Sequence, residues 1–188
     1  MDAVVLYGSH YGHTARYAQW LAEALDCRAV PARKAAAAAL EGCGTVIFGG
    51  GLYAGGVAGA RFLKDHAGAL VARRLALFTC GLADPANPEN AENLRAAAER
   101  ALPPELRAQT AVFHLRGGID YPHLGPVHRA MMAALRAGLR RRDPAQLRQE
   151  DRELLATYGQ HVNFLDRAAL EPLVAWALTG PSDTAESR

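Results

Sequence analysis

Short, continuous apolar runs alternate with helix-spaced apolar positions along the first part of the chain. The four strongest runs are residues 3–7, 45–48, 75–79 and 110–115, and residues 27–30 form a weaker fifth run that ends at Pro31. Runs without polar alternation are typical of strands that are covered on both faces. We therefore expect a sheet that is packed against helices on its two sides.

Helical patterns fill the intervals between these runs. The predicted helices cover residues 14–25, 58–70 and 87–102, and the alanine run at 35–39 is also expected to be helical. In the third of these helices, Asn87 is the expected N-cap and Pro88 stands in the first turn. Strand alternating with helix predicts an α/β fold with a doubly wound parallel sheet and right-handed crossovers.

No further strand is evident after Leu115, so we expect a helical C-terminal extension. A helix at 125–142 carries Val127, Met131, Leu135 and Leu139 four residues apart. A charged connector at 141–151 and a last helix that includes residues 172–178 follow it. We expect one domain over residues 1–178, with a core at 2–116, an extension at 117–178 and a disordered tail at 179–188.

Charge and cysteine content narrow the class of protein. The formal net charge of +2 is too small to indicate nucleic-acid binding. Cys27, Cys43 and Cys80 are widely spaced and odd in number, which favours reduced thiols in a cytoplasm over a disulfide framework or a CxxC site. We expect neither a signal peptide nor a membrane span of roughly 20 apolar residues, so any membrane contact is expected to be peripheral.

The first apolar run ends in VVLYGSHYGHT, residues 4–14, a glycine-bearing loop that leads into a helix. Its backbone N–H groups and the helix dipole form an anion site, to which Ser9 and Thr14 add hydroxyls. The lysine and spacing of a nucleotide P-loop are missing, which favours a phosphomonoester over ATP or GTP hydrolysis. His10 and His13 lack a third ligand, so we predict no metal. The alternative is a tight turn without a ligand.

Two more loops follow later apolar runs. GGGLYAGGVAG, residues 49–59, predicts close approach of the backbone to a flat ligand on which Tyr53 stacks; a surface tyrosine is the alternative. Its partial match to a dinucleotide fingerprint does not follow the first strand, so we discount NAD. In TCGLADPANPE, residues 79–89, Cys80 lacks a partner histidine and is expected to be a packing residue rather than a nucleophile.

These three loops resemble those of the flavodoxin family over residues 2–116. The resemblance implies a flavodoxin-like five-stranded parallel sheet of order 2-1-3-4-5, with helices on both faces, that binds FMN. The implied phosphate loop consists of Ser9, His10, Tyr11, Gly12, His13 and Thr14. The implied borders of the flavin ring are Gly51, Leu52, Tyr53 and Ala54 on one side and Thr79, Cys80, Gly81 and Leu82 on the other.

The stretch GGIDYPHLGPVHRAMM, residues 117–132, is similar to the corresponding segment of the short, flavodoxin-like protoporphyrinogen dehydrogenases. This second resemblance implies an FMN-dependent oxidoreductase that acts on a porphyrinogen and passes electrons to a quinone or a redox partner protein. It also implies that Gly117, Gly118, Asp120 and Tyr121 lie at the edge of the sheet beside the flavin. Beyond Arg142 the chain is longer than this pattern.

Other interpretations remain open at this point. A flavodoxin-type electron carrier has no substrate of its own, and a flavodoxin-like module without flavin is also consistent with the pattern. No catalytic residue is assigned, although His123 and His128 are candidates for a general base or, equally, surface or helix-cap histidines. We expect the helix at 125–142 to pack on the sheet; the alternative is peripheral contact of its arginines with the inner face of the membrane.

Overall fold

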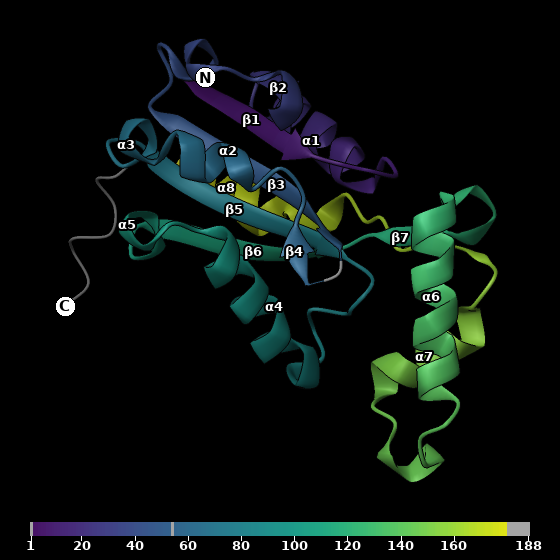
Figure 1. Ribbon diagram of the computed structural model, residues 1–188. Coiled ribbons are helices and arrows are strands. Elements are labelled where there is room, and N and C mark those ends of the chain that lie inside the picture. Colours follow the sequence, from purple (N-terminus) through teal and green to yellow (C-terminus); the bar gives the residue numbers. More distant parts are fainter. Residues whose placement is uncertain (1, 54, 180–188) are drawn as a thin grey trace.

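The computed structural model describes residues 2–53 and 55–179 (Figure 1). Five parallel strands form the central sheet in the order β2-β1-β3-β5-β6. They are β1 Ala3–Gly8, β2 Arg28–Pro31, β3 Thr45–Tyr53, β5 Arg74–Gly81 and β6 Thr110–Arg116. Each of the five predicted strands is therefore present, and their order along the sheet confirms the expected flavodoxin-like arrangement.

Helices cover both faces of this sheet (Figure 1). On one face, α1 (His13–Ala24) and α8 (Glu171–Leu178) bury their apolar sides against Val5, Ile47 and Phe78. The other face is covered by α2 (Arg61–Asp65), α3 (Ala67–Leu70), α4 (Pro88–Ala101) and α5 (Pro104–Arg107). Neighbouring strand residues such as Val4 and Val5 point to opposite faces, which is why the runs are apolar without alternation.

The observed helices agree with the sequence prediction in some places and differ from it in others. Asn87 is the N-cap of α4, and its side chain accepts a hydrogen bond of 3.0 Å from the Glu89 N–H. The helix predicted at 58–70 is instead divided into α2 and α3, and the alanine run forms a 3-10 turn, η2 (Ala37–Leu40). The other 3-10 turns are η1 (Ala32–Lys34), η3 (Tyr121–His123), η4 (Pro144–Gln146) and η5 (Ala168–Leu170).

The prediction that no strand follows Leu115 was wrong. β7 (Gly118–Asp120) pairs antiparallel with β8 (His161–Asn163), and Ile119 lies opposite Val162. A further two-residue strand, β4 (Gly56–Val57), pairs with the end of β3. Strands of two or three residues leave no periodic pattern in the sequence, and the residues that pair in β7 and β8 are far apart along the chain.

The extension also differs from a helix packed on the sheet. In Figure 1, α6 (Pro126–Leu139) projects beyond the strand ends, where it lies beside α7 (Gln149–Thr157). Leu139 is the buried residue of α6. The expectation that this helix covers a sheet face was therefore wrong, because its neighbours are α7 and the loops at the strand ends. Within the described part of the chain, no helix has the length and apolar character of a membrane span.

The chain returns from the extension to the core through a hydrogen-bonded tyrosine. Tyr17 of α1 is fully buried, and its hydroxyl donates to the Arg116 carbonyl oxygen at 2.8 Å and accepts from the Asp166 N–H at 3.0 Å. This residue therefore joins the end of β6 to the segment that leads into α8. The predicted connector at 141–151 contains η4 and the start of α7, where Asp151 is buried. The predicted tail lies outside the described residues beyond Thr179.

Candidate functional site at the carboxyl ends of the strands

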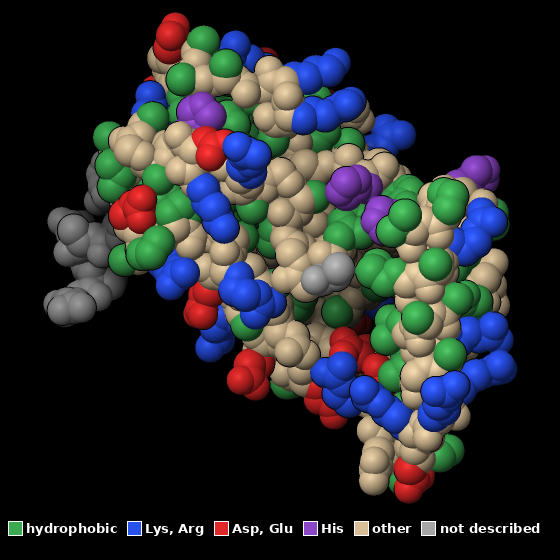
Figure 2. Space-filling model, viewed as in Figure 1, with side chains coloured by type: hydrophobic (Ala, Val, Ile, Leu, Met, Phe, Trp, Pro, Cys, Tyr) green, Lys and Arg blue, Asp and Glu red, His purple; other side chains and the backbone are tan. Residues whose placement is uncertain are grey.

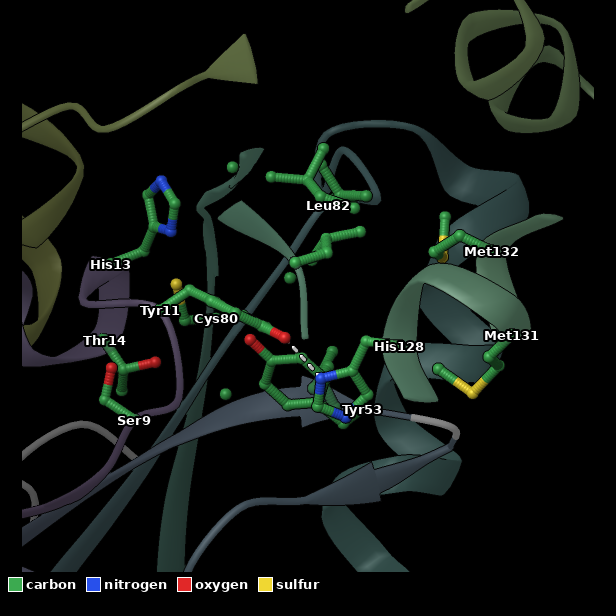
Figure 3. Close-up of a pocket in the computed structure, with 16 residues that line it drawn as sticks. Ser9, Tyr11, His13, Thr14, Tyr53, Cys80, Leu82, His128, Met131 and Met132 are labelled. Carbon is green, nitrogen blue, oxygen red and sulfur yellow. Dashed lines mark hydrogen bonds between the residues drawn. The ribbon is translucent and has the colours of Figure 1, made fainter. Parts of the chain in front are cut away.

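The three loops singled out in the sequence meet at one edge of the sheet. Because the strands are parallel and in register, Gly8 lies opposite Gly50, Gly51 opposite Cys80, and Gly81 opposite Arg116. The loops that follow β1, β3 and β5 therefore surround one cavity (Figure 3). Its lining comprises Ser9, Tyr11, His13, Thr14, Gly51, Leu52, Tyr53, Cys80, Gly81, Leu82, Gly118, Ile119, Leu124, His128, Met131 and Met132.

Most of the predicted site residues line this cavity, but not all. His10, Gly12, Thr79, Gly117, Asp120 and Tyr121 lie outside its lining, and Ala54 falls outside the described residues. Five lining residues were not predicted as part of the site, namely Ile119, Leu124, His128, Met131 and Met132. The spacing of apolar residues indicates that 125–142 is helical, but it carries no signal that this helix turns back over the strand ends.

The loop after β1 has the geometry of an anion site. Gly12 has a φ of +92°, and α1 begins at the next residue with no acidic side chain in its first turn. A left-handed residue at this point turns the chain into the helix, which is why glycine stands here. The first-turn N–H groups of α1 have no intrahelical acceptors, so they and the helix dipole remain available to an anion.

Two hydroxyl side chains complete this loop. Ser9 Oγ accepts a hydrogen bond of 3.1 Å from the Gly12 N–H, which closes the turn. Thr14, on the first turn of α1, is only 3% exposed and lines the cavity. His13 lines the cavity as well, and its pKa is lowered by burial and then by the nearby His161, although Asp120 opposes the shift. The loop therefore offers mainly neutral donors, as the sequence predicts.

Three aromatic rings, those of Tyr11, Tyr53 and His128, line the side of the cavity nearest α6, and His10 packs behind them. The rings of Tyr53 and His128 stack with centroids 5.3 Å apart and planes 25° apart. The Tyr11 hydroxyl is hydrogen-bonded to Nδ1 of His128 (Figure 3), and it accepts a hydrogen bond of 3.3 Å from the Gly125 N–H. The His10 and Tyr53 rings pack edge to face, with their centroids 4.7 Å apart. Tyr11 thereby holds the start of α6 against the loops of the sheet.

Cys80 is a packing residue, as the sequence predicts. It is 5% exposed, and burial raises the pKa of its thiol to about 12, which a hydrogen bond with Thr14 only partly offsets. A thiol with this pKa is protonated at neutral pH and is a poor nucleophile. Close packing also explains two glycines of the extension: a Cβ on Gly117 would lie 2.7 Å from the Cys80 sulfur, and one on Gly118 would lie 2.3 Å from the Val162 carbonyl oxygen.

Asp120 and Tyr121 contact other residues of the extension and do not line the cavity. Asp120 Oδ2 accepts from Nδ1 of His123 at 2.8 Å and lies 3.3 Å from Nδ1 of His161. Desolvation raises the pKa of Asp120, but the hydrogen bond and charge of His123 and the contact with His161 outweigh it, so the net pKa is lowered. Tyr121 packs with Ile119 and Leu124 in a small apolar cluster. Of the two candidate bases, His128 reaches the cavity, whereas the His123 side chain is 82% exposed.

The strand order defines a doubly wound α/β protein, and the cavity lies at its topological switch point. The sequence model of the flavodoxin-domain family matches residues 4–144, most of the chain. The protein belongs to this family. The match continues past the sheet and through α6, so it extends further than the resemblance over residues 2–116.

Solved structures with a similar fold share little sequence with this chain. Flavodoxin 2 from Bacillus cereus is 15% identical, with a TM-score of 0.46, over 83% of this chain and 94% of that one. A WrbA-like flavodoxin from Agrobacterium tumefaciens is 22% identical, with a TM-score of 0.38, over 60% and 82% of the two chains. No curated sequence matches the chain. Because these TM-scores are low, the assignment rests on the family match and the topology.

Proposed function

We propose that this protein binds FMN and carries out a redox reaction with it. The observation that carries the proposal is the meeting of an anion site at the N-terminus of α1 with two glycine-bearing loops and Tyr53 around one cavity. When bound, FMN supplies the ability to accept and donate one or two electrons. The chain contributes binding and orientation of the cofactor and a wall that separates it from water.

The site residues fit an FMN molecule in two parts. The first-turn N–H groups of α1, with the hydroxyls of Ser9 and Thr14, are suited to the phosphate. Tyr53 and Leu52 on the β3 side, and Gly81 and Leu82 on the β5 side, are suited to the flat ring, because aromatic and apolar groups stack on it. A Cβ on Gly81 would lie 3.0 Å from Leu52 Cδ1, so Leu52 has to move before the ring can lie between the two sides.

A finer proposal concerns the reaction. We infer an oxidoreductase of the protoporphyrinogen-dehydrogenase type, with a quinone or a protein as acceptor and peripheral contact with the inner face of the membrane. Its support is the wall that Leu124, His128, Met131 and Met132 build over the cavity. A second cavity adjoins the first at Leu82 and lies among Arg116, Leu154 and Phe164. Two neighbouring cavities suit a substrate next to a cofactor better than an electron carrier with an open flavin edge.

The test of cofactor binding comes first and is simple. Purified protein should be yellow or should become yellow when FMN is added, and titration should show saturable quenching of FMN fluorescence. Riboflavin, which lacks the phosphate, should bind more weakly because the α1 site contributes nothing to it. Colourless protein that takes up no FMN would contradict the proposal and favour a module without flavin.

The test of the reaction is separate. With FMN bound and oxygen excluded, protoporphyrinogen should be converted to protoporphyrin while an added quinone is reduced. Turnover supports the dehydrogenase. If the protein holds FMN and passes electrons between partner proteins but does not oxidise the porphyrinogen, it is an electron carrier, and the finer proposal is wrong.

A further inference from the structure

α6 presents an apolar face to solvent. Val127, Met131 and Leu135, which recur every four residues, are 78%, 38% and 44% exposed. The other exposed positions of α6 are Pro126, four alanines, Gly138 and a single charged residue, Arg129. In a globular protein the apolar side of a helix is normally buried, so an exposed one marks a surface that binds something.

The charges on α6 itself, and on the residues next to it in the sequence, are of one sign. Residues 121–142 contain five arginines and no acidic residue. Arg129, Arg140, Arg141 and Arg142 are exposed, and among the described residues none of them forms an ion pair with a carboxylate. Figure 2 shows basic side chains gathered along one flank of α6 and toward its C-terminal end.

The remaining arginine marks the boundary of the face. Arg136 is half-buried, and its guanidinium lies 4.4 Å from the centroid of the Tyr158 ring of the segment after α7. On the inward side of the helix, His128 and Met132 line the cavity at the strand ends, and Leu139 is buried. α6 is therefore amphipathic with its polar flank made of arginine and its apolar face open.

We propose that α6 docks on an anionic lipid bilayer, with Val127, Met131 and Leu135 against the acyl boundary and Arg129 and Arg140–Arg142 on the headgroups. An apolar face flanked by cations is the pattern of helices that lie in the membrane interface. A second copy of this chain would bring two arginine clusters together and is disfavoured by charge, whereas anionic lipid complements it. Met131 also lines the cavity at the strand ends, and Leu135 also lines the second cavity, so docking would place the redox site at the membrane surface.

The inference deepens the proposed function by naming the surface and the lipid, but its test needs no flavin. The full chain is sedimented with vesicles of phosphatidylcholine alone and with vesicles of equimolar phosphatidylcholine and phosphatidylglycerol. We expect co-sedimentation with the anionic vesicles, little with the neutral ones, and weaker binding as salt is raised, because screening reduces the attraction.

Three variants locate the surface. Leu135→Asp and Val127→Asp each place a charge on the apolar face and should weaken binding on the order of 10-fold. Replacement of Arg140, Arg141 and Arg142 by serine should weaken it on the order of 100-fold, since each basic residue near an anionic surface contributes about 1 kcal/mol. The matched control is Val112→Asp, because Val112 is 40% exposed on β6, away from α6, and should leave lipid binding unchanged.

Each outcome decides the matter. Loss of lipid binding in the α6 variants but not in Val112→Asp supports the proposal. It is overturned if the chain sediments with neither vesicle, if it binds both equally, or if Leu135→Asp only converts a dimer to a monomer, which would make the face an interface between copies. Protein that binds FMN but no lipid contradicts this inference and the membrane contact of the finer proposal, but leaves the proposal of an FMN-dependent redox reaction intact. Protein that binds lipid but no FMN contradicts the proposed function and leaves this inference intact.

Discussion

Leu77 and Leu135 are both leucines, but they lie in two regions of the molecule that treat apolar side chains differently. Leu77 lies in β5 and is fully buried between the sheet and its covering helices, whereas Leu135 lies in α6 and is 44% exposed. The first region, residues 2–116, is organised around two large apolar clusters, one on each sheet face. In the extension, a three-residue cluster of Ile119, Tyr121 and Leu124 supports the part that covers the site.

The comparison teaches that the sheet core and the extension use their apolar residues differently. α8 is the exception within the extension, because Leu170, Leu173 and Ala177 return to the sheet core beside α1. The segment between β6 and α8 is therefore anchored at both ends, while its middle can use apolar residues for contact with something outside the chain. Regions with few buried apolar contacts are the ones that open most easily.

The largest expected effect is a difference in stability between a substitution in the sheet core and one in α6. Leu77→Ala should lower the free energy of unfolding by about 2–5 kcal/mol, because it leaves a cavity in a packed core. Leu135→Ala should lower it by less than about 1 kcal/mol, because this residue is 44% exposed and loses less packing. Urea denaturation followed by circular dichroism measures both. Equal losses would mean that α6 belongs to the folding core.

The next prediction tests whether Gly12 is needed for FMN binding or only for the stability of a turn. Gly12→Val should weaken FMN binding at least roughly tenfold, since a β-branched residue in the left-handed region costs about 1–2 kcal/mol and displaces the start of α1. Gly42, with a φ of +68° and no neighbour within 4 Å of an added Cβ, is the matched control. Gly42→Val should lose similar stability and keep its FMN affinity, as measured by fluorescence titration.

Thr14→Ala offers a milder version of the same test. It removes one buried hydroxyl and should weaken FMN binding by about 1 kcal/mol without unfolding the protein. Unchanged flavin affinity in both Gly12→Val and Thr14→Ala would mean that the loop after β1 does not hold the phosphate.

Substitutions of Tyr53 and of His128, which stack on each other, should change the affinity for FMN in opposite directions. If the flavin ring stacks on Tyr53, Tyr53→Leu should weaken FMN binding by about 0.5–1.5 kcal/mol. His128 now stacks on the same ring, so His128→Ala removes a competitor and should tighten binding by a similar or smaller amount. Dissociation constants from FMN titration of both variants give the comparison. Weaker binding in both would show that His128 contacts the cofactor instead.

The smallest expected effect is a dependence of stability on pH that comes from His114 in β6. Burial and then the charge of Arg95 lower the pKa of His114 below its ordinary value of 6.5, and Thr79 Oγ1 lies 2.7 Å from its Nδ1. The unfolded chain then binds more protons than the folded one below about pH 6.5, so stability should be constant above that pH and fall as the pH drops through it.

His114→Gln should flatten part of this decline. His13 contributes a shift of the same sign, for burial and the nearby His161 lower its pKa, so a residual slope is expected. Urea midpoints of wild type and variant at about pH 8 and about pH 5.5 measure the difference. Identical slopes would show that His114 is not responsible.

Sequence patterns predicted the strongly apolar parts of the fold. All five parallel strands and α1, α4 and α8 were expected, most of them within two residues of their observed bounds, because burial leaves a clear apolar pattern. The exception is β3, which continues to Tyr53, five residues beyond the predicted 45–48. β7 and β8 were missed because each has three residues and the pairing depends on contacts across the extension. The division of 58–70 into α2 and α3 was missed for a related reason: a break after Asp65 leaves the apolar spacing unchanged.

For the site, the three loops were found from their glycines and their places after apolar runs. The wall over the cavity was not, since Met131 and Met132 look like ordinary residues of an amphipathic helix in one dimension. His128 was considered only as a candidate base, and its stacking on Tyr53 and bond with Tyr11 join residues more than 70 positions apart.

The sequence by itself determined the doubly wound sheet and the anion loop, because both arise from local features: continuous apolar runs, and a glycine immediately before a helix. Only the tertiary structure decided where α6 lies. Its apolar spacing is equally consistent with a face packed on the sheet and a face open to solvent. The choice depends on the Tyr11 hydrogen bonds, the β7–β8 pairing and the contact with α7, which together hold the helix beyond the strand ends.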